Sequence, residues 1–393
     1  ELHLQIGDFN LLSHGGENLR MIEFINDGLM TIFFLLVGLE IKRELLVGEL
    51  SSFRKAALPF IAACGGMLLP VLVFMSICPP GSEGGQGLAI PMATDIAFSL
   101  GVLSLLGSRV PLSLKIFLTA FAVVDDIGGI LVIAIFYSSH VSYGYILVAV
   151  LLYILLYFIG KRGATNKIFF LVIGVVIWYL FLQSGIHSTI SGVILAFVIP
   201  AKPRLDVGKY IEHIRHTIAG FPVMESGSIV LTNEQIAKLK EVESASDRVI
   251  SPLQSFEDNL HGAVNYLILP LFAFVNAGVV FSGGGELVGD VGIAVAAGLL
   301  FGKFAGIYFF TWLAIKIKLT PMPPGMTWTN LSGIALLGGI GFTVSLFIAN
   351  LSFGANFPIL LNQAKFGVLS GTILSGLLGY IVLWIVLPAR RRK

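Results

Sequence analysis

Residues 114–137 read Leu114-Lys-Ile-Phe-Leu-Thr-Ala-Phe-Ala-Val-Val-Asp-Asp-Ile-Gly-Gly-Ile-Leu-Val-Ile-Ala-Ile-Phe-Tyr137, an apolar segment of membrane-spanning length with Asp125 and Asp126 inside it. A charge at the bilayer centre costs about 2.5–3.5 kcal/mol on insertion scales. Two other apolar segments contain equally unusual residues: segment 88–106 contains Thr94-Asp95, and segment 291–314 contains Lys303. Because such residues persist where they face a cavity and act there, they indicate a site at which a small cation and protons compete.

The composition is that of a polytopic membrane protein. Of 393 residues, 56% are hydrophobic and 12% are charged, and the mean hydropathy is +0.90. A soluble domain carries about twice that share of charge. We therefore expect an all-α polytopic membrane protein. Hydropathy predicts eleven spans, near residues 21–47, 57–77, 86–106, 112–137, 144–160, 167–182, 185–200, 258–281, 289–315, 330–353 and 364–388.

The loop charges predict the orientation of these spans. Lys and Arg fall in alternate loops and in the tail Arg390-Arg-Arg-Lys393, whereas the opposite loops contain none. By the positive-inside rule the basic side is cytoplasmic, so we expect a cytoplasmic C-terminus. The chain starts at Glu1 without a Met or a signal peptide, and a further span before it would make an even twelve.

The chain divides into four regions. Region 1–20 is a periplasmic β-hairpin, 21–200 holds the first set of spans, 201–257 is a long cytoplasmic loop, and 258–393 holds the second set and the basic tail. Leu2, Leu4 and Ile6 alternate with polar residues before a turn at Gly7-Asp8. An exposed hairpin edge could pair with a second copy to form a homodimer; a frayed end is the alternative.

The long 201–257 loop contains one predicted helix. Thr232 can cap it, and it runs to about Val249 with an apolar face. A regulatory role for this segment is one possibility.

Two spans are predicted to be interrupted. Pro91 removes a backbone donor and disfavours helix just before Thr94-Asp95. Gly338, Gly339 and Gly341 are each costly inside a helix, by about 1 kcal/mol. Interrupted segments in corresponding halves of a chain indicate a transporter binding site. The alternative for the glycines is close helix packing.

Asp125 and Asp126 point about 100° apart on a continuous helix, so that one can face a funnel and the other a partner. Carboxylates and the Thr94 hydroxyl are hard oxygen ligands that suit Na⁺. We predict a cation and proton site made of Asp126, Asp125, Asp95 and Thr94. Lys303 is expected to pair with Asp125 or Asp95, either as a static bridge or as one that breaks during transport.

Further ionisable residues lie at the cytoplasmic boundary: Glu40, Glu44, Glu257 and His261. They are either interfacial anchors or a pH-response cluster, since His changes charge near neutral pH. His187, near the outer end of a span, is expected to be structural.

The chain resembles the bacterial NhaA family of Na⁺/H⁺ antiporters from about Ile25 to Pro388, outside the long loop. The segments that carry the resemblance are Asn26-Asp27, Phe33-Phe-Leu-Leu-Val-Gly-Leu-Glu-Ile-Lys-Arg-Glu-Leu45, Ala93-Thr-Asp-Ile-Ala-Phe98, Leu106-Gly-Ser-Arg-Val-Pro111, Lys115-Ile-Phe-Leu118, Asp125-Asp126, Leu269-Pro-Leu-Phe-Ala-Phe274, Asn276-Ala-Gly278, Gly302-Lys303 and Gly339-Ile-Gly-Phe-Thr343. The family's first helix is absent before Glu1, and the 201–257 loop is longer than in compact members.

The resemblance implies twelve helices in inverted repeats, two of them crossed and interrupted, and a dimerising N-terminal hairpin. Asp126 is then the main carrier, and Asp125 pairs with or releases Lys303. Glu40, Glu44, Glu257 and His261 match the pH-response region. The implied activity is electrogenic exchange of Na⁺ or Li⁺ for protons in pH homeostasis and salt tolerance, with membrane lipid as surroundings, no cofactor and no nucleic acid.

Other classes fit less well. An intramembrane aspartyl protease needs Gly-x-Gly-Asp, but Phe342 follows Gly339-Ile-Gly341. A retinal-based pump would have seven spans with its lysine in the last. A sodium-coupled organic-solute symporter of related fold is the nearest alternative, yet these spans offer few polar groups for a solute.

Overall fold

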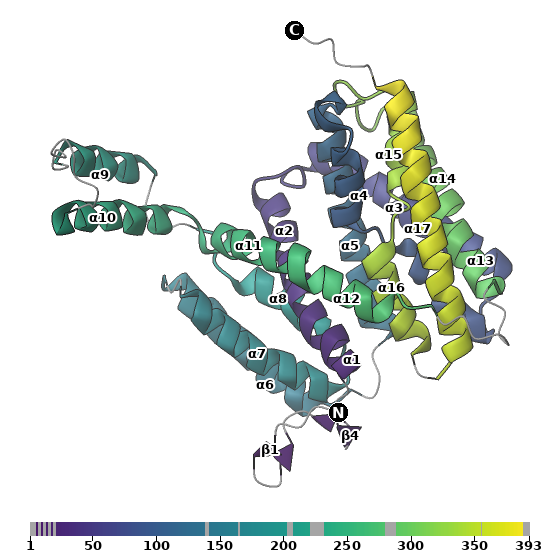
Figure 1. Cartoon of the computed structure of the whole chain (residues 1–393), viewed down its shortest axis with the longest axis horizontal. Helices are drawn as coiled ribbons and strands as arrows, with labels where there is room; N and C mark the ends of the chain where they lie inside the picture. The colour runs from purple at the N-terminus through teal and green to yellow at the C-terminus, as the bar shows by residue number, and fades with distance from the viewer. Residues whose placement is uncertain are drawn as a thin grey trace.

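The computed structural model describes residues 5–6, 9–10, 13–14, 17–18, 21–137, 141–163, 166–202, 207–220, 232–279, 288–354 and 356–387. Over these residues the chain is almost entirely helical. Figure 1 shows a bundle of long helices, from which α9 and α10 project on one side. The predicted all-α class is confirmed.

Four two-residue strands precede the helices. β1 (Gln5–Ile6) pairs with β2 (Phe9–Asn10), and β3 (Ser13–His14) pairs with β4 (Glu17–Asn18), both antiparallel. The predicted turn at Gly7-Asp8 lies outside the described residues, so the hairpin over 1–20 stays a prediction.

The first set of helices contains one break. A long helix made of α1, the π-helical turn η1 and α2 leads into α3, and the short turns η2 and η3 precede the break before α4. The bounds are α1 Met21–Phe24, η1 Ile25–Leu29, α2 Met30–Leu46, α3 Phe53–Ile77, η2 Glu83–Gly87, η3 Ile90–Met92, α4 Ile96–Ser104, η4 Gly107–Arg109, α5 Leu112–Phe136, α6 Tyr143–Lys161, α7 Lys167–Ser184 and α8 Thr189–Val198.

The long loop holds two helices, α9 (Val207–Ala219) and α10 (Asn233–Val249), which pack side by side. Thr232 and Gln235 cap α10 reciprocally: the Gln235 N–H donates to Thr232 Oγ1 at 3.3 Å, and the Thr232 N–H donates to Gln235 Oε1 at 2.9 Å. The predicted helix is thus confirmed. The sequence analysis missed α9, although Ile211, Ile214 and Ile218 have helical spacing.

The second set also contains one break, between α15 and α16. α17 is the longest helix and lies along α13 and α15 (Figure 1). The bounds are α11 Pro252–Ala263, η5 Val264–Ile268, α12 Leu269–Asn276, α13 Asp290–Ala297, η6 Gly298–Gly302, α14 Lys303–Lys316, α15 Trp328–Leu337, α16 Phe342–Phe353 and α17 Pro358–Val386.

Within the described residues, seven helices are long and apolar enough to cross a membrane, and nine spans result if each bent pair counts as one. The bent pairs are Glu83–Met92 with Ile96–Ser104, at 46°, and Trp328–Leu337 with Phe342–Phe353, at 44°. The other two predicted spans, 185–200 and 258–281, are helical but are not among these candidates. Seven to nine spans are therefore supported, and eleven stays a prediction.

Glycines let two helices of the bundle come into backbone contact. α3 packs along α14, and a Cβ added to Gly306 would lie 2.1 Å from the Gly65 carbonyl oxygen. A Cβ added to Gly65 would lie 2.4 Å from the Gly306 oxygen. Since apolar lipid provides little drive for helix association, such close packing is what holds membrane helices together. It also fixes the position of Lys303, one turn before Gly306.

Gly306→Ala should destabilise the protein by about 1–3 kcal/mol, because its methyl group overpacks the α3–α14 contact. Thermal unfolding of the detergent-purified protein measures this. Gly144→Ala in α6 is the control, since nothing lies within 4 Å of its added Cβ. Equal unfolding temperatures for the two variants would contradict the packing argument.

Candidate functional site

The two helix breaks meet and satisfy each other's polar groups. The Asp95 N–H donates to the Ile340 carbonyl oxygen at 2.6 Å, and Thr94 Oγ1 donates to the Gly338 oxygen at 2.8 Å. Ser99 Oγ donates to the Leu337 oxygen at 3.0 Å. An unpaired backbone group in the bilayer core costs several kcal/mol, so broken helices are tolerated where such partners exist.

Asp95 joins the first turns of two helices. Its Oδ1 accepts from the Phe98 N–H at 3.1 Å and so caps α4. Its Oδ2 accepts from the Thr343 N–H at 3.1 Å and from the Thr343 hydroxyl, at the start of α16. Both helix N-termini carry partial positive charge, which the carboxylate offsets. Asp95 is thus held in place, at 3% exposure, by bonds to both of its oxygens.

The three predicted glycines lie in the second break, and close packing explains why these positions hold no larger residue. A Cβ on Gly339 would lie 2.3 Å from the Leu299 oxygen. Neighbouring atoms lie at similar distances from a Cβ on Gly338 or Gly341, and none of the three glycines has a positive φ. Both interpretations of these glycines therefore hold: the helix is interrupted here, and its neighbours approach too closely for a side chain.

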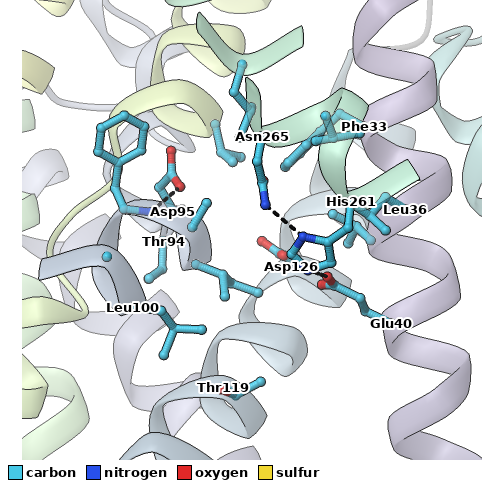
Figure 2. A pocket seen from close by; sticks show the side chains of 18 of the residues that line it. Phe33, Leu36, Glu40, Thr94, Asp95, Leu100, Thr119, Asp126, His261 and Asn265 are labelled. Atoms are coloured by element: carbon cyan, nitrogen blue, oxygen red, sulfur yellow. Dashed lines mark hydrogen bonds and ion pairs between the residues drawn. The ribbon is translucent and has the colours of Figure 1, made fainter. Parts of the chain in front are cut away.

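A cavity of about 1040 Å³ reaches the crossing (Figure 2). Thr94 and Asp95 line it, together with Thr119, Val123 and Asp126 of α5. The three α5 residues are spaced by four and three positions and so share one helix face. Among the described residues, the Asp126 carboxylate has no hydrogen-bond or ion-pair partner, and Asp126 is 7% exposed. It is therefore a carboxylate available to a ligand that enters the cavity.

Asp125 points away from this cavity. Lys303 Nζ donates to its Oδ2 at 2.6 Å, and both side chains are fully buried. The ammonium also lies 5.6 Å from the Phe121 ring centroid, within range of a cation–π contact. Asp125 Oδ1 has no hydrogen-bond partner in the described part of the chain. The two adjacent acids thus have separate surroundings: Asp126 faces the cavity, and Asp125 faces α14.

Three of the four predicted boundary residues, Glu40, Glu257 and His261, line the same cavity, together with Arg43. Figure 2 shows Glu40 and His261 at its wall. Arg43 forms ion pairs with Glu257 and, at 3.3 Å, with Glu44. His261 Nε2 lies 3.7 Å from Glu40 Oε1. Burial raises the pKa of the Glu257 carboxyl, and the nearby Arg43 partly offsets this. Glu44 lies behind Arg43 and accepts from the Glu49 N–H at 3.0 Å.

Several polar contacts near the site were not predicted. Asn276, fully buried, donates to Asn26 Oδ1 at 2.7 Å and accepts from Asn350 Nδ2 at 2.9 Å. This chain of amides ties η1, α12 and α16 together. Asparagines inside apolar spans were the available signal.

His187 Nδ1 lies 3.2 Å from Thr189 Oγ1, and its ring meets Phe347 edge-on. This environment fits the structural role expected for His187.

Crossed helix breaks beside an unpartnered carboxylate in a cavity are the architecture of a secondary ion transporter. The chain matches the model of the Na⁺/H⁺ antiporter 1 family over residues 2–383 and belongs to that family. It is 95% identical over 393 residues to Na(+)/H(+) antiporter NhaA of Bacteroides thetaiotaomicron, covering 100% of this chain and 90% of that protein.

Other relatives have the same name. That of Bacteroides fragilis strain YCH46 is 81% identical over 391 residues, which cover 100% of this chain and 90% of the relative. That of Porphyromonas gingivalis strain W83 is 47% identical over 388 residues, which cover 97% of this chain and 86% of the relative. The chain is therefore a multi-pass Na⁺/H⁺ antiporter and not an enzyme. The protease, retinal-pump and symporter alternatives are set aside.

Lys303→Ala should cost about 3–5 kcal/mol of stability, because it leaves the buried Asp125 carboxylate without its partner. Thermal unfolding of the purified protein measures the loss. Asp125→Asn in the Lys303→Ala background should restore part of it, since no buried charge then remains unpaired. A single variant as stable as the wild type would show that the ion pair is not a structural element.

Proposed function

We propose that Asp126 is the residue that carries Na⁺ and protons alternately. The observation that supports this is its carboxylate, which lines the cavity and has no hydrogen-bond or ion-pair partner among the residues that the structure describes. When ionised it offers a negatively charged, hard oxygen ligand to Na⁺, and protonation removes that charge and so weakens the site for Na⁺. One site that Na⁺ and protons occupy in turn is sufficient for exchange: a cation enters from one side of the membrane as a proton leaves, and the reverse happens on the other side.

Thr94 and Asp95 supply the remaining oxygens at the helix crossing. The Thr94 hydroxyl donates its proton to Gly338, so its lone pairs remain available to a cation. Asp125 acts as the second acid. When Lys303 gives up its proton and releases Asp125, Asp125 can join Asp126 in holding Na⁺. One proton from Asp126 and one from Lys303 then leave for each Na⁺ bound, which makes exchange electrogenic. A static Asp125–Lys303 bridge is the alternative, in which Asp126, Thr94 and Asp95 form the whole site.

Glu40, Glu44, Glu257 and His261 form the pH-response region in this proposal. His261 faces Glu40, and Arg43 lies between Glu257 and Glu44, so a change of protonation alters the charge at the cavity wall. The loop Lys and Arg residues on this side of the chain support a cytoplasmic location for this region and for the C-terminus, in a bacterial plasma membrane. Li⁺, a hard cation like Na⁺, is a second substrate.

The two bent pairs occupy corresponding places in the two sets of spans, which supports an inverted-repeat architecture. The strand pairs β1–β2 and β3–β4 support a homodimer, since an unpaired strand edge is a template for a second copy. Membrane lipid surrounds the exposed apolar faces of the outer helices.

Asp126→Asn should abolish exchange while the protein remains folded, because the amide can neither bind a proton in this range nor offer a charge to Na⁺. The measurement is dequenching of a pH-sensitive dye in proteoliposomes on addition of Na⁺ or Li⁺. Asp290→Asn, an exposed acid in the first turn of α13, is the matched control and should exchange normally. Wild-type exchange by Asp126→Asn would refute the carrier assignment.

Glu257→Gln should raise the apparent KM for Na⁺ at alkaline pH and move half-maximal activity to more acidic pH. The substitution leaves Arg43 as excess positive charge at the cavity wall, which weakens the binding of both Na⁺ and protons to the cavity. The same dye assay across a pH series measures both effects. Glu241→Gln on α10 removes an acid far from the cavity and should change neither. An unchanged profile in Glu257→Gln would favour the interfacial-anchor interpretation.

A further inference from the structure

A second cavity, of about 290 Å³, lies on the other face of α5 from the ion cavity. Ser113, Ile116 and Phe117 of α5 line it, together with the first turns of α3 and the 320–324 segment that follows α14. It shares no lining residue with the ion cavity. The N-terminal ends of α3 and α5 lie at this second cavity, on the side of the protein that we propose is cytoplasmic.

Two hydroxyls at this cavity have no partner. Thr320 is 5% exposed, and its Oγ1 forms no hydrogen bond with any described residue. The same holds for the buried Oγ of Ser113. Leaving a buried hydroxyl unsatisfied costs about 1–3 kcal/mol. Two such groups at one cavity indicate that they bond to a ligand that the protein chain does not itself supply.

The charges around this cavity favour an anion. Arg54 and Lys55 lie in the first turn of α3, where the partial positive charge of the helix end disfavours cations. Neither α3 nor α5 has an acidic residue in its first turn or a side-chain cap on its N-terminus. Lys55 Nζ lies 3.8 Å from Glu49, whereas Arg54 forms no ion pair among the described residues. The cavity thus has two basic lining residues and two helix N-termini around it, but one acidic lining residue, Glu49.

Exposed apolar residues directly precede two of the lining residues in the chain. Phe53, before Arg54, is 85% exposed, and Leu112, before Ser113, is 71% exposed. Exposed large apolar side chains next to basic ones are typical of the membrane interface, where a lipid places its headgroup over its acyl chains.

We propose that this cavity binds a phosphate-bearing anion, with Arg54 as its charge partner and Thr320 and Ser113 as hydrogen-bond donors. Helix N-termini, a guanidinium and hydroxyls are the groups that bind phosphate in proteins. The exposed Phe53 and Leu112, next in the chain to Arg54 and Ser113, favour an anionic phospholipid headgroup over free phosphate as the source. The site is separate from the transport path and binds its ligand whether or not Asp126 is the carrier.

The test is binding and thermal stabilisation of the full, detergent-purified chain with three probes: dihexanoyl phosphatidylglycerol, dihexanoyl phosphatidylcholine and inorganic phosphate. Phosphatidylglycerol should bind and raise the unfolding temperature, and phosphatidylcholine should do neither. Arg54→Gln and Thr320→Val should each weaken phosphatidylglycerol binding, Arg54→Gln by about tenfold or more. Arg215→Gln, an exposed arginine of α9, is the control and should bind as the wild type does.

Protection by inorganic phosphate that Arg54→Gln also removes would support the site and assign free phosphate as its ligand. Equal stabilisation by the two phospholipids would overturn the proposal, since the anionic headgroup would then not be recognised. Equal affinity in Arg54→Gln and the wild type, or equal loss in Arg215→Gln, would also overturn it.

Discussion

The structure depends on one constraint: a broken helix inside a membrane must find partners for its free backbone groups. Here the two breaks are each other's partners. Asp95 and Thr94 bond across to Ile340 and Gly338, while the Asp95 carboxylate holds the first turns of α4 and α16. Neither break could exist alone at this depth. The crossing therefore sets a rigid frame of polar atoms around which the cavity forms.

α5 runs beside this frame and places two adjacent acids in different surroundings. Asp126 turns toward the cavity, where no side chain in the described part of the chain pairs with it, and Asp125 turns toward Lys303 on α14. The glycine contact between α3 and α14 fixes the position of Lys303. A carboxylate without a protein partner and a carboxylate with one are suited to different tasks. The first can exchange ligands, and the second holds a charge in place or releases it as part of the cycle.

Much of this arrangement was predictable because membranes make local sequence rules strict. Pro91 and the glycines at 338–341 indicated both breaks, and the cost of a buried charge singled out Asp125, Asp126 and Lys303. The sequence could not give the partners. The packing of helices that are distant in the sequence decides whether Lys303 pairs with Asp125 or with Asp95. It also brings Arg43 and Glu257 together. The amide chain through Asn276 was missed for the same reason: asparagines inside apolar spans are a signal, but they do not show which of them meet.

The central claim is that Na⁺ and protons compete for Asp126. Isothermal titration of Na⁺ into the detergent-purified protein, in buffers of different ionisation enthalpy, measures Na⁺ affinity and proton release together. The account predicts that Na⁺ binding releases protons and that the Kd for Na⁺ weakens toward about tenfold per pH unit under acidic conditions. A Kd independent of pH, with no proton released, would contradict it.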